Sequence, residues 1–162
     1  MRVQGRLREQ IGQRSFASTT LRHKLATRTI KWRDDISARI PPELAAQSFT
    51  KGSEAAWRPD SAPKVVEWLG QNGFAVLGTE LWIVRDDRIQ PGIIVNGVCE
   101  IHGNTISHTQ NESWDAYVSR SAQETLRYFS SFAEPPEAKQ QGDVFFDVVW
   151  VSESDFLNLK MQ

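Results

Sequence analysis

The sequence places its one cysteine near a histidine, and a thiol nucleophile with a general base would need such a pair. Cys99 and His102 are three residues apart in a segment with the composition of a β-strand. Side chains at this spacing on a strand point to opposite faces, because successive residues alternate. Activation of a thiol requires the base within hydrogen-bond reach, so the spacing disfavours a catalytic pair.

Metal binding is a second chemistry to consider. His102, His108 and either Glu100 or Glu112 could supply nitrogen and oxygen ligands. Glu100 and His102 would share one face of a strand, because they are two residues apart. The spacing matches no zinc pattern, and we predict neither a metal site nor a cofactor.

Other catalytic signatures are missing from the sequence. There is no glycine-rich phosphate loop and no GxSxG nucleophile motif. Acidic pairs such as Asp86-Asp87 stand where turns and helix caps are expected. A glycosidase-type pair of carboxylates must be held at a set distance across a cleft, and spacing in the sequence does not specify that distance.

The strands that would position these residues are marked by apolar runs. Residues 74–84 are apolar, β-branched and aromatic, with glycine before them and a polar turn after them. Asn96-Gly97 between residues 93–95 and 98–101 is a strong hairpin signal, because a type I′ turn needs positive φ at both positions. Residues 144–151 are apolar on both faces except for Asp147, which is typical of a central strand.

Two helices have clear apolar stripes. The first begins near Asp60 or Ser61, and its stripe is Ala62, Val65, Val66 and Leu69. The second spans residues 112–132 with Thr109 or Asn111 as cap, and its expected buried stripe is Trp114, Val118, Ala122, Leu126 and Phe129. Weaker signals predict helices from Asp34 to Arg39, over 43–47 and after Ser152, with a loop at 48–56.

This order of elements predicts an α+β fold. We expect an antiparallel sheet of three to five strands, with helices packed on one face and at its ends. Trp82 and Ile83 are adjacent on a predicted strand, so they must face opposite sides of the sheet. At least one large aromatic residue is therefore expected to be exposed or covered by an additional element.

The charge is unevenly distributed along the 162 residues. Residues 1–33 carry nine Lys and Arg and one acidic residue, a net charge of +8, so the remaining residues carry −9 of the total of −1. We therefore divide the chain into a basic, peripheral N-terminal extension at 1–33 and a single acidic domain at 34–162. The first 31 residues also have the composition of a transit peptide; the alternatives are a basic arm and residues added by an upstream start codon.

The composition also bears on partners and location. An acidic domain attracts basic partners and repels nucleic acid. No apolar run approaches the roughly 18 residues of a membrane span, and we expect no membrane association. A single cysteine excludes an internal disulfide and fits the reducing cytoplasm.

Two segments resemble the immunity protein 40 family of bacterial polymorphic toxin systems. They are Val76–Trp82 (VLGTELW) and Ser121–Tyr128 (SAQETLRY), and the similarity covers roughly residues 50–151. The family usually has LGGD in the first segment, where this chain has Thr79 and Glu80 in place of the last two residues. The resemblance implies a small bacterial protein that binds and silences a cognate toxin domain, without enzymatic activity or a cofactor.

The acidic domain suits such a role, because a nuclease toxin would present a basic substrate-binding face. We predict that partner-binding residues lie at the hairpin end of the sheet and at the start of the long helix: Asp86, Asp87, Glu100, Glu112 and Asp115. The alternative function is a small hydrolase or ligand-binding domain that uses the concave face of the sheet.

Overall fold

The computed structural model describes residues 40–52 and 54–160. The elements in chain order are α3 (Pro42–Ala45), β1 (Ser48–Lys51), β2 (Glu54–Trp57), α4 (Ala62–Gln71), β3 (Ala75–Arg85), β4 (Arg88–Pro91), β5 (Ile93–Val95), β6 (Val98–Glu100), β7 (Gly103–Thr105), α5 (Trp114–Ser131), α6 (Pro136–Gln141), β8 (Asp143–Val151) and α7 (Glu153–Lys160). The extension expected at 1–33 and the helix expected from Asp34 to Arg39 lie outside the described residues.

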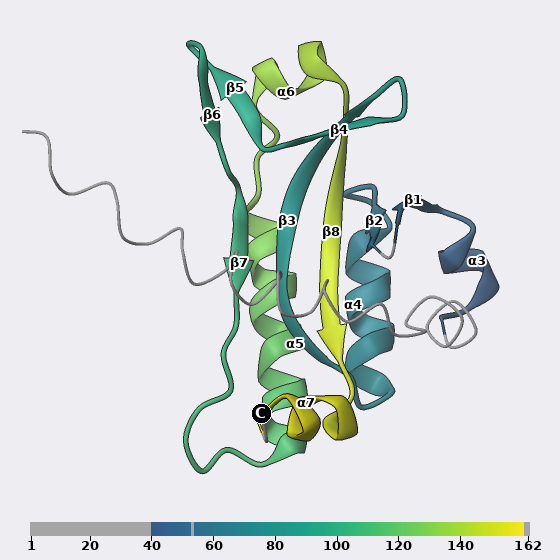
Figure 1. Cartoon of the computed structure of the whole chain (residues 1–162), viewed down its shortest axis with the longest axis vertical. Helices are drawn as coiled ribbons and strands as arrows, with labels where there is room; N and C mark the ends of the chain where they lie inside the picture. Colours follow the sequence, from purple (N-terminus) through teal and green to yellow (C-terminus); the bar gives the residue numbers. More distant parts are fainter. Residues whose placement is uncertain (1–39, 53, 161–162) are drawn as a thin grey trace, which may run out of the picture. The chain divides into compact units, whose positions relative to one another are not determined.

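An antiparallel sheet forms the centre of the fold (Figure 1). Its order is β1-β2-β8-β3, and the other side of β3 carries both β4 and β7. The long strands β3 and β8 pair from Ala75 opposite Val151 to Val84 opposite Asp143. The α+β class is confirmed, as is the central position of residues 144–151.

The sheet has six strands, more than the three to five expected. The strands β1, β2, β4 and β7 were not predicted, whereas the predicted Asn96-Gly97 hairpin forms a separate two-stranded sheet, β5-β6. The segment 48–56 was expected to be a loop and instead forms most of the β1–β2 hairpin. Gly52 lies in the turn with a φ of 61°, whereas the polar residues Ser48, Thr50 and Lys51 belong to β1. Trp57 at the end of β2 is 1 % exposed, so burial of apolar residues outweighs the polar composition of this short segment.

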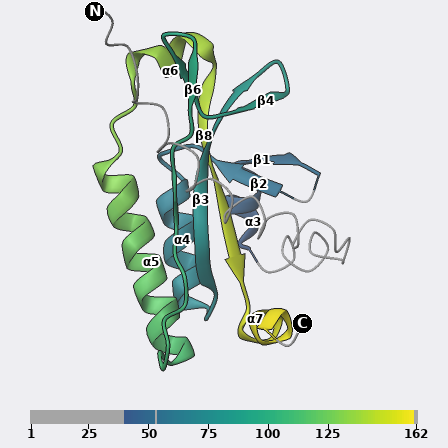
Figure 2. The same cartoon turned by 60° about the vertical axis from the view of Figure 1, so that its left-hand side comes forward.

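Helices α4 and α5 cover one face of the sheet, and α6 and α7 lie at its two ends (Figures 1 and 2). This is the expected arrangement, and the predicted stripe of α4 is fully buried. The two covering helices approach closely, because a Cβ added to Gly70 would lie 3.1 Å from the Cβ of Ala122. None of the helices in the described part of the chain is long and apolar enough to cross a bilayer.

The predicted buried stripe of α5 is partly wrong. Val118 and Ala122 are buried as expected, but Trp114, Leu126 and Phe129 are only partly buried. The most deeply buried positions are Tyr117, Ser121 and Thr125, each 0 % exposed. The hydroxyls of these residues all have hydrogen-bond partners: Ile106 O for Tyr117, the Val76 amide and Val118 O for Ser121, and Ser121 O for Thr125. Burial of a hydroxyl is costly only when it is unpaired, so this polar face can pack inward.

A β-bulge interrupts the pairing of β3 with β8 between Val76 and Gly78. The segment Val76–Trp82, which resembles the family, lies within β3, and β7 pairs with it from Gly78 to Glu80. A Cβ on Gly78 would lie 2.4 Å from the carbonyl oxygen of Asn104, so only glycine permits this approach. The Thr79 hydroxyl donates a 2.7 Å hydrogen bond to the Asn104 side chain, which fixes β7 against β3.

The other face of the sheet has its own apolar cluster. Trp82, Phe145 and Ala56 form its centre. Ile83 belongs to the main core under the helices, so the prediction that Trp82 and Ile83 face opposite sides is confirmed. Trp82 is 3 % exposed, and partly buried residues pack around it: Phe49, Val84 and Ile89.

Candidate partner-binding surface

The β3–β4 turn carries two of the acidic residues predicted to bind a partner. Asp86 and Asp87 both have a left-handed backbone, with φ of 49° and 58°, which aspartate tolerates better than most residues. Lys51 from the neighbouring hairpin donates a 3.1 Å hydrogen bond to the Asp87 carbonyl oxygen. Both aspartates are exposed, at the end of the sheet from which the β5–β6 hairpin also projects (Figure 1).

Glu100 lies on β6, in that projecting hairpin. Its side chain is 52 % exposed, and its Oε2 is 3.7 Å from Nε2 of His102. That distance permits an ion pair with a protonated imidazole. The structure therefore brings Asp86, Asp87 and Glu100 to the same end of the sheet.

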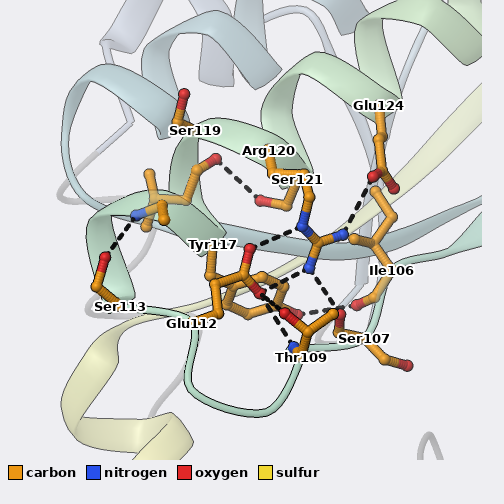
Figure 3. Close-up of polar contacts among 12 residues, drawn as sticks. Ile106, Ser107, Thr109, Glu112, Ser113, Tyr117, Ser119, Arg120, Ser121 and Glu124 are labelled. Atoms are coloured by element: carbon orange, nitrogen blue, oxygen red, sulfur yellow. Dashed lines mark hydrogen bonds and ion pairs between the residues drawn. The ribbon is translucent and has the colours of Figure 1, made fainter.

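Glu112 has a different environment, shown in Figure 3. Arg120 donates hydrogen bonds to both of its carboxylate oxygens, at 2.7 Å and 2.8 Å, and the backbone amide of Thr109 donates a third at 3.0 Å. The hydrogen bonds from Arg120 are the main reason that the pKa of Glu112 falls to about 2. Its side chain is only 9 % exposed, so this carboxylate stabilises the loop before α5 and has little surface to offer a partner.

Asp115 is exposed in the first turn of α5, where a negative charge interacts favourably with the helix dipole. The N-cap of α5 is Ser113, whose side chain accepts a hydrogen bond from Ala116 N, and not the expected Thr109 or Asn111. Trp114 donates to the carbonyl oxygen of Gly73, just before β3. Asp86 follows the other end of this 11-residue strand, which at about 3.3 Å per residue is roughly 35 Å away. The structure therefore does not bring Glu112 and Asp115 together with Asp86, Asp87 and Glu100.

The β5–β6 hairpin also displays apolar residues that were predicted to form strands but not predicted to be exposed. The large apolar residues exposed in the described part of the chain include Ile94 at 42 %, Val98 at 63 % and Ile101 at 65 %. A signal was present in the sequence, because the residues flanking Asn96-Gly97 are apolar at consecutive positions. A two-stranded hairpin can pack only one of its two faces against a single sheet, so apolar residues on its other face stay exposed.

The side chain of Gln141, at the end of α6, holds this hairpin in place. Its amide group donates a 2.8 Å hydrogen bond to the carbonyl oxygen of Ile94 and accepts one of 2.8 Å from the amide of Ile94. Gln90 donates a further bond of 2.9 Å to the same Gln141 oxygen. The two bonds to Ile94 imitate those of a neighbouring strand, so the hairpin is anchored at its β5 side.

The residues considered for catalysis or metal binding have structural contacts. Cys99 donates through its thiol to the carbonyl oxygen of Pro91 at 3.0 Å. His108 packs against Tyr117, with ring centroids 5.1 Å apart, and against Phe156, at 5.3 Å. Within the described ranges, no three His, Cys, Asp or Glu residues are grouped so that they could hold a metal ion. The alternative reading as a hydrolase therefore gains no support from these side chains.

Comparison with known proteins gives one match. The family model described as immunity protein 40 matches residues 44–150, which is more than half of the chain. Neither the curated proteins nor the solved structures contain a match. The matched range begins within α3 and ends one residue before the end of β8, so it includes the sheet apart from Val151, both covering helices and the projecting hairpin. The chain belongs to the immunity protein 40 family.

Proposed function

We propose that this protein binds directly to a cognate toxin domain and neutralises it, so that the bacterium producing both is protected in its own cytoplasm. Membership of the immunity protein 40 family carries this proposal. The family match spans the sheet, apart from Val151, and both helices that cover it, so the residues that form the core of the domain take part in the resemblance. Binding by contact requires no catalytic group or cofactor of the protein's own.

The charge of the domain favours a toxin with a basic surface. Residues 40–162 contain nine Lys and Arg and seventeen Asp and Glu, a net charge of −8. A nuclease presents lysine and arginine to the phosphates of its substrate, so an acidic inhibitor would be attracted to that face and would repel nucleic acid. We propose a nuclease domain as the target on this ground.

Asp86, Asp87 and Glu100 are the acidic residues that we place in the binding surface. They share one end of the sheet with the exposed hairpin (Figure 1), and together they could meet a single basic patch. Glu112 is already neutralised by Arg120. It and Asp115 lie at the far end of β3, so they would require a second, separate contact.

Co-expression with the neighbouring toxin gene tests the proposal. The wild-type protein should restore growth and copurify with the toxin domain. Reversal of Asp86, Asp87 and Glu100 to lysine should slow association and reduce its dependence on salt, because exposed charges act mainly on the association rate. Reversal of Asp60, Glu67 and Glu153, which are also exposed, is the matched control with the same change in net charge.

The possible results separate the parts of the proposal. If the wild-type protein gives neither growth nor a complex, the immunity function is wrong. If both triple variants associate equally slowly, only net charge matters and the chosen surface is wrong. If the toxin leaves DNA and RNA intact in vitro, the nuclease assignment is wrong while the immunity function stands.

A further inference from the structure

Strand β6 is exposed in a way that no other strand of the described chain matches. All three of its residues, Val98, Cys99 and Glu100, are exposed, and Ile101 follows at 65 % exposure. Isolated exposed apolar residues are ordinary, but apolar residues gathered in one place mark interaction sites. Here Ile94, Val98 and Ile101 lie within eight consecutive residues.

The outer edge of β6 is also open. Val95 and Val98 flank the Asn96-Gly97 turn and form the first pair of the ladder, so they are hydrogen-bonded to each other in a two-residue hairpin. In the next pair, Ile94 and Cys99, the amide and carbonyl groups point away from the partner strand. The bonds from Ile94 to Gln141 agree with this geometry. The corresponding groups of Cys99 point outward, where the described chain adds no further strand.

We infer that β6 is the docking strand for the cognate toxin: an extended segment of the toxin domain pairs with its outer edge. This inference rests on the proposed immunity function and gives it a location. The backbone of Cys99 would supply hydrogen bonds to the added strand. Ile101 and Ile94 would contact apolar side chains of the toxin, and a lysine or arginine beside them would meet Glu100.

The occupant is expected to be the toxin because of the charge of the domain. Glu100 stands on the docking strand, and residues 40–162 carry a net charge of −8, although exposed Arg85 and Arg88 balance Asp86 and Asp87 in the β3–β4 turn. A second copy would bring another Glu100 and another acidic domain against the first, and like charges at short range are unfavourable. A basic segment of a toxin would instead be attracted.

Gln141 holds the hairpin that contains this docking strand in its extended conformation. An isolated two-stranded hairpin is marginally stable in water, yet here a side-chain amide fixes the position of Ile94 on the inner strand through two bonds of 2.8 Å. A strand that is already extended loses less conformational entropy on binding.

The first test replaces an exposed apolar side chain by a charged one in the full chain. Ile101→Asp should weaken binding to the purified toxin domain by about tenfold or more, the size of effect typical of a residue at the centre of an interface. Leu157→Asp is the matched control, since Leu157 is 52 % exposed and lies on α7 at the other end of the sheet (Figure 1). The affinity of Leu157→Asp for the toxin domain should equal that of the wild-type protein.

The second test addresses the backbone. Cys99→Pro removes the outward-pointing amide, whereas Cys99→Ala keeps it and removes only the thiol bond to Pro91. Proline is tolerated on an edge strand whose amide faces outward. Cys99→Pro should bind about tenfold more weakly than Cys99→Ala, and amide hydrogen exchange of the wild-type protein should slow at Cys99 and Ile101 when the toxin is added.

The outcomes distinguish this inference from the proposed function. If the wild-type protein forms no complex, the immunity function itself fails. If the complex forms but Ile101→Asp and Cys99→Pro bind as tightly as their controls, the docking strand is wrong and the function stands. If the isolated protein is a dimer that Ile101→Asp converts to a monomer, a second copy occupies β6. If Cys99 and Ile101 are already protected from exchange in the isolated monomer, the chain itself covers the strand. Either result overturns the inference.

Discussion

The hydroxyl of Ser121 on α5 accepts a 3.0 Å hydrogen bond from the backbone amide of Val76 on β3. Val76 stands at the β-bulge, where the ladder with β8 is interrupted. A helix side chain thus stabilises the irregular part of the strand, and the same hydroxyl donates to the Val118 carbonyl oxygen at 3.0 Å.

Ser121→Ala should therefore lower the free energy of unfolding. The substitution leaves the amide of Val76 buried without its partner, which costs about 1–3 kcal/mol. Ser119→Ala is the control, because Ser119 is on the same helix but exposed, and its effect should stay within about 0.5 kcal/mol. Urea unfolding of the three proteins measures both values; equal losses would show that the bond to Val76 contributes nothing.

Tyr117 should be more important for stability than Trp114. Tyr117 is 0 % exposed, whereas Trp114 is partly exposed, although the sequence pattern favoured Trp114 as the anchor of this helix. Tyr117→Ala should cost about 3–5 kcal/mol, as large-to-small changes in a core do, and Trp114→Ala clearly less. Tyr117→Phe isolates the 2.8 Å bond to the Ile106 carbonyl oxygen and should cost about 1 kcal/mol. A larger loss for Trp114→Ala would contradict this ranking.

The stability of the protein should depend on Glu112 in acid. Hydrogen bonds from Arg120 lower the pKa of Glu112 from 4.5 to about 2 in the folded protein. Because the folded value is the lower one, the stabilisation is fully present above about pH 4.5 and is lost as the pH falls towards 2. The difference in unfolding free energy between the wild-type protein and Glu112→Gln should shrink over this range.

Carboxyl NMR titration measures the same pKa directly. Arg120→Gln removes the main donors, so in that variant the Glu112 pKa should rise towards its ordinary value. An ordinary Glu112 pKa in the wild-type protein would contradict the bonding seen in Figure 3.

Gly78→Ala should destabilise the pairing of β7 with β3. The added methyl group would lie 2.4 Å from the Asn104 carbonyl oxygen, so the backbone of one strand must move. Amide exchange at Thr79 and Thr105 should accelerate while exchange in α4 changes little. Thr79→Val provides a comparison, since it removes the hydroxyl bond to Asn104 without adding a clash; its effect should be the smaller.

The basic extension at 1–33 remains a prediction from charge alone. Removal of residues 1–31 should leave the melting temperature nearly unchanged if the extension is peripheral to the acidic domain. Thermal unfolding of the full and shortened chains measures this. A fall of many degrees would show that the domain boundary is misplaced.

Periodicity in the sequence was sufficient to predict much of the fold. The strands β3 and β8, the Asn96-Gly97 hairpin and the helix α4 all follow from local apolar patterns and turn residues. The face of α5 that is buried does not follow from such patterns. The Ser121 hydroxyl on this face accepts a hydrogen bond from the amide of Val76, which is 45 residues away in the sequence. The residues next to a serine in the sequence do not show whether its hydroxyl is buried and bonded to a distant amide or is exposed to solvent.

The acidic residues predicted to form one binding surface lie in two separate places, again because contacts between distant residues are not visible in the local sequence. Asp86, Asp87 and Glu100 belong to consecutive turns and strands, so their common location follows from a local meander. Glu112 was counted as a free charge because nothing in its immediate sequence indicates that Arg120, eight residues further along the chain, donates hydrogen bonds to it. The apolar residues of β6 were visible in the sequence, but they were assigned only to a strand of the hairpin and not to an exposed surface.

The amide side chain of Gln141 has one more consequence, for the stoichiometry of any complex. A free hairpin has two edges and could accept a strand on each, which is how open sheets grow into aggregates. Here the inner edge is occupied by a side chain, which cannot itself be extended by another strand. If β6 is the docking strand that we infer, this arrangement limits the complex to one toxin per immunity protein, and we expect Gln141→Ala to open a second edge and with it a route to polymerisation.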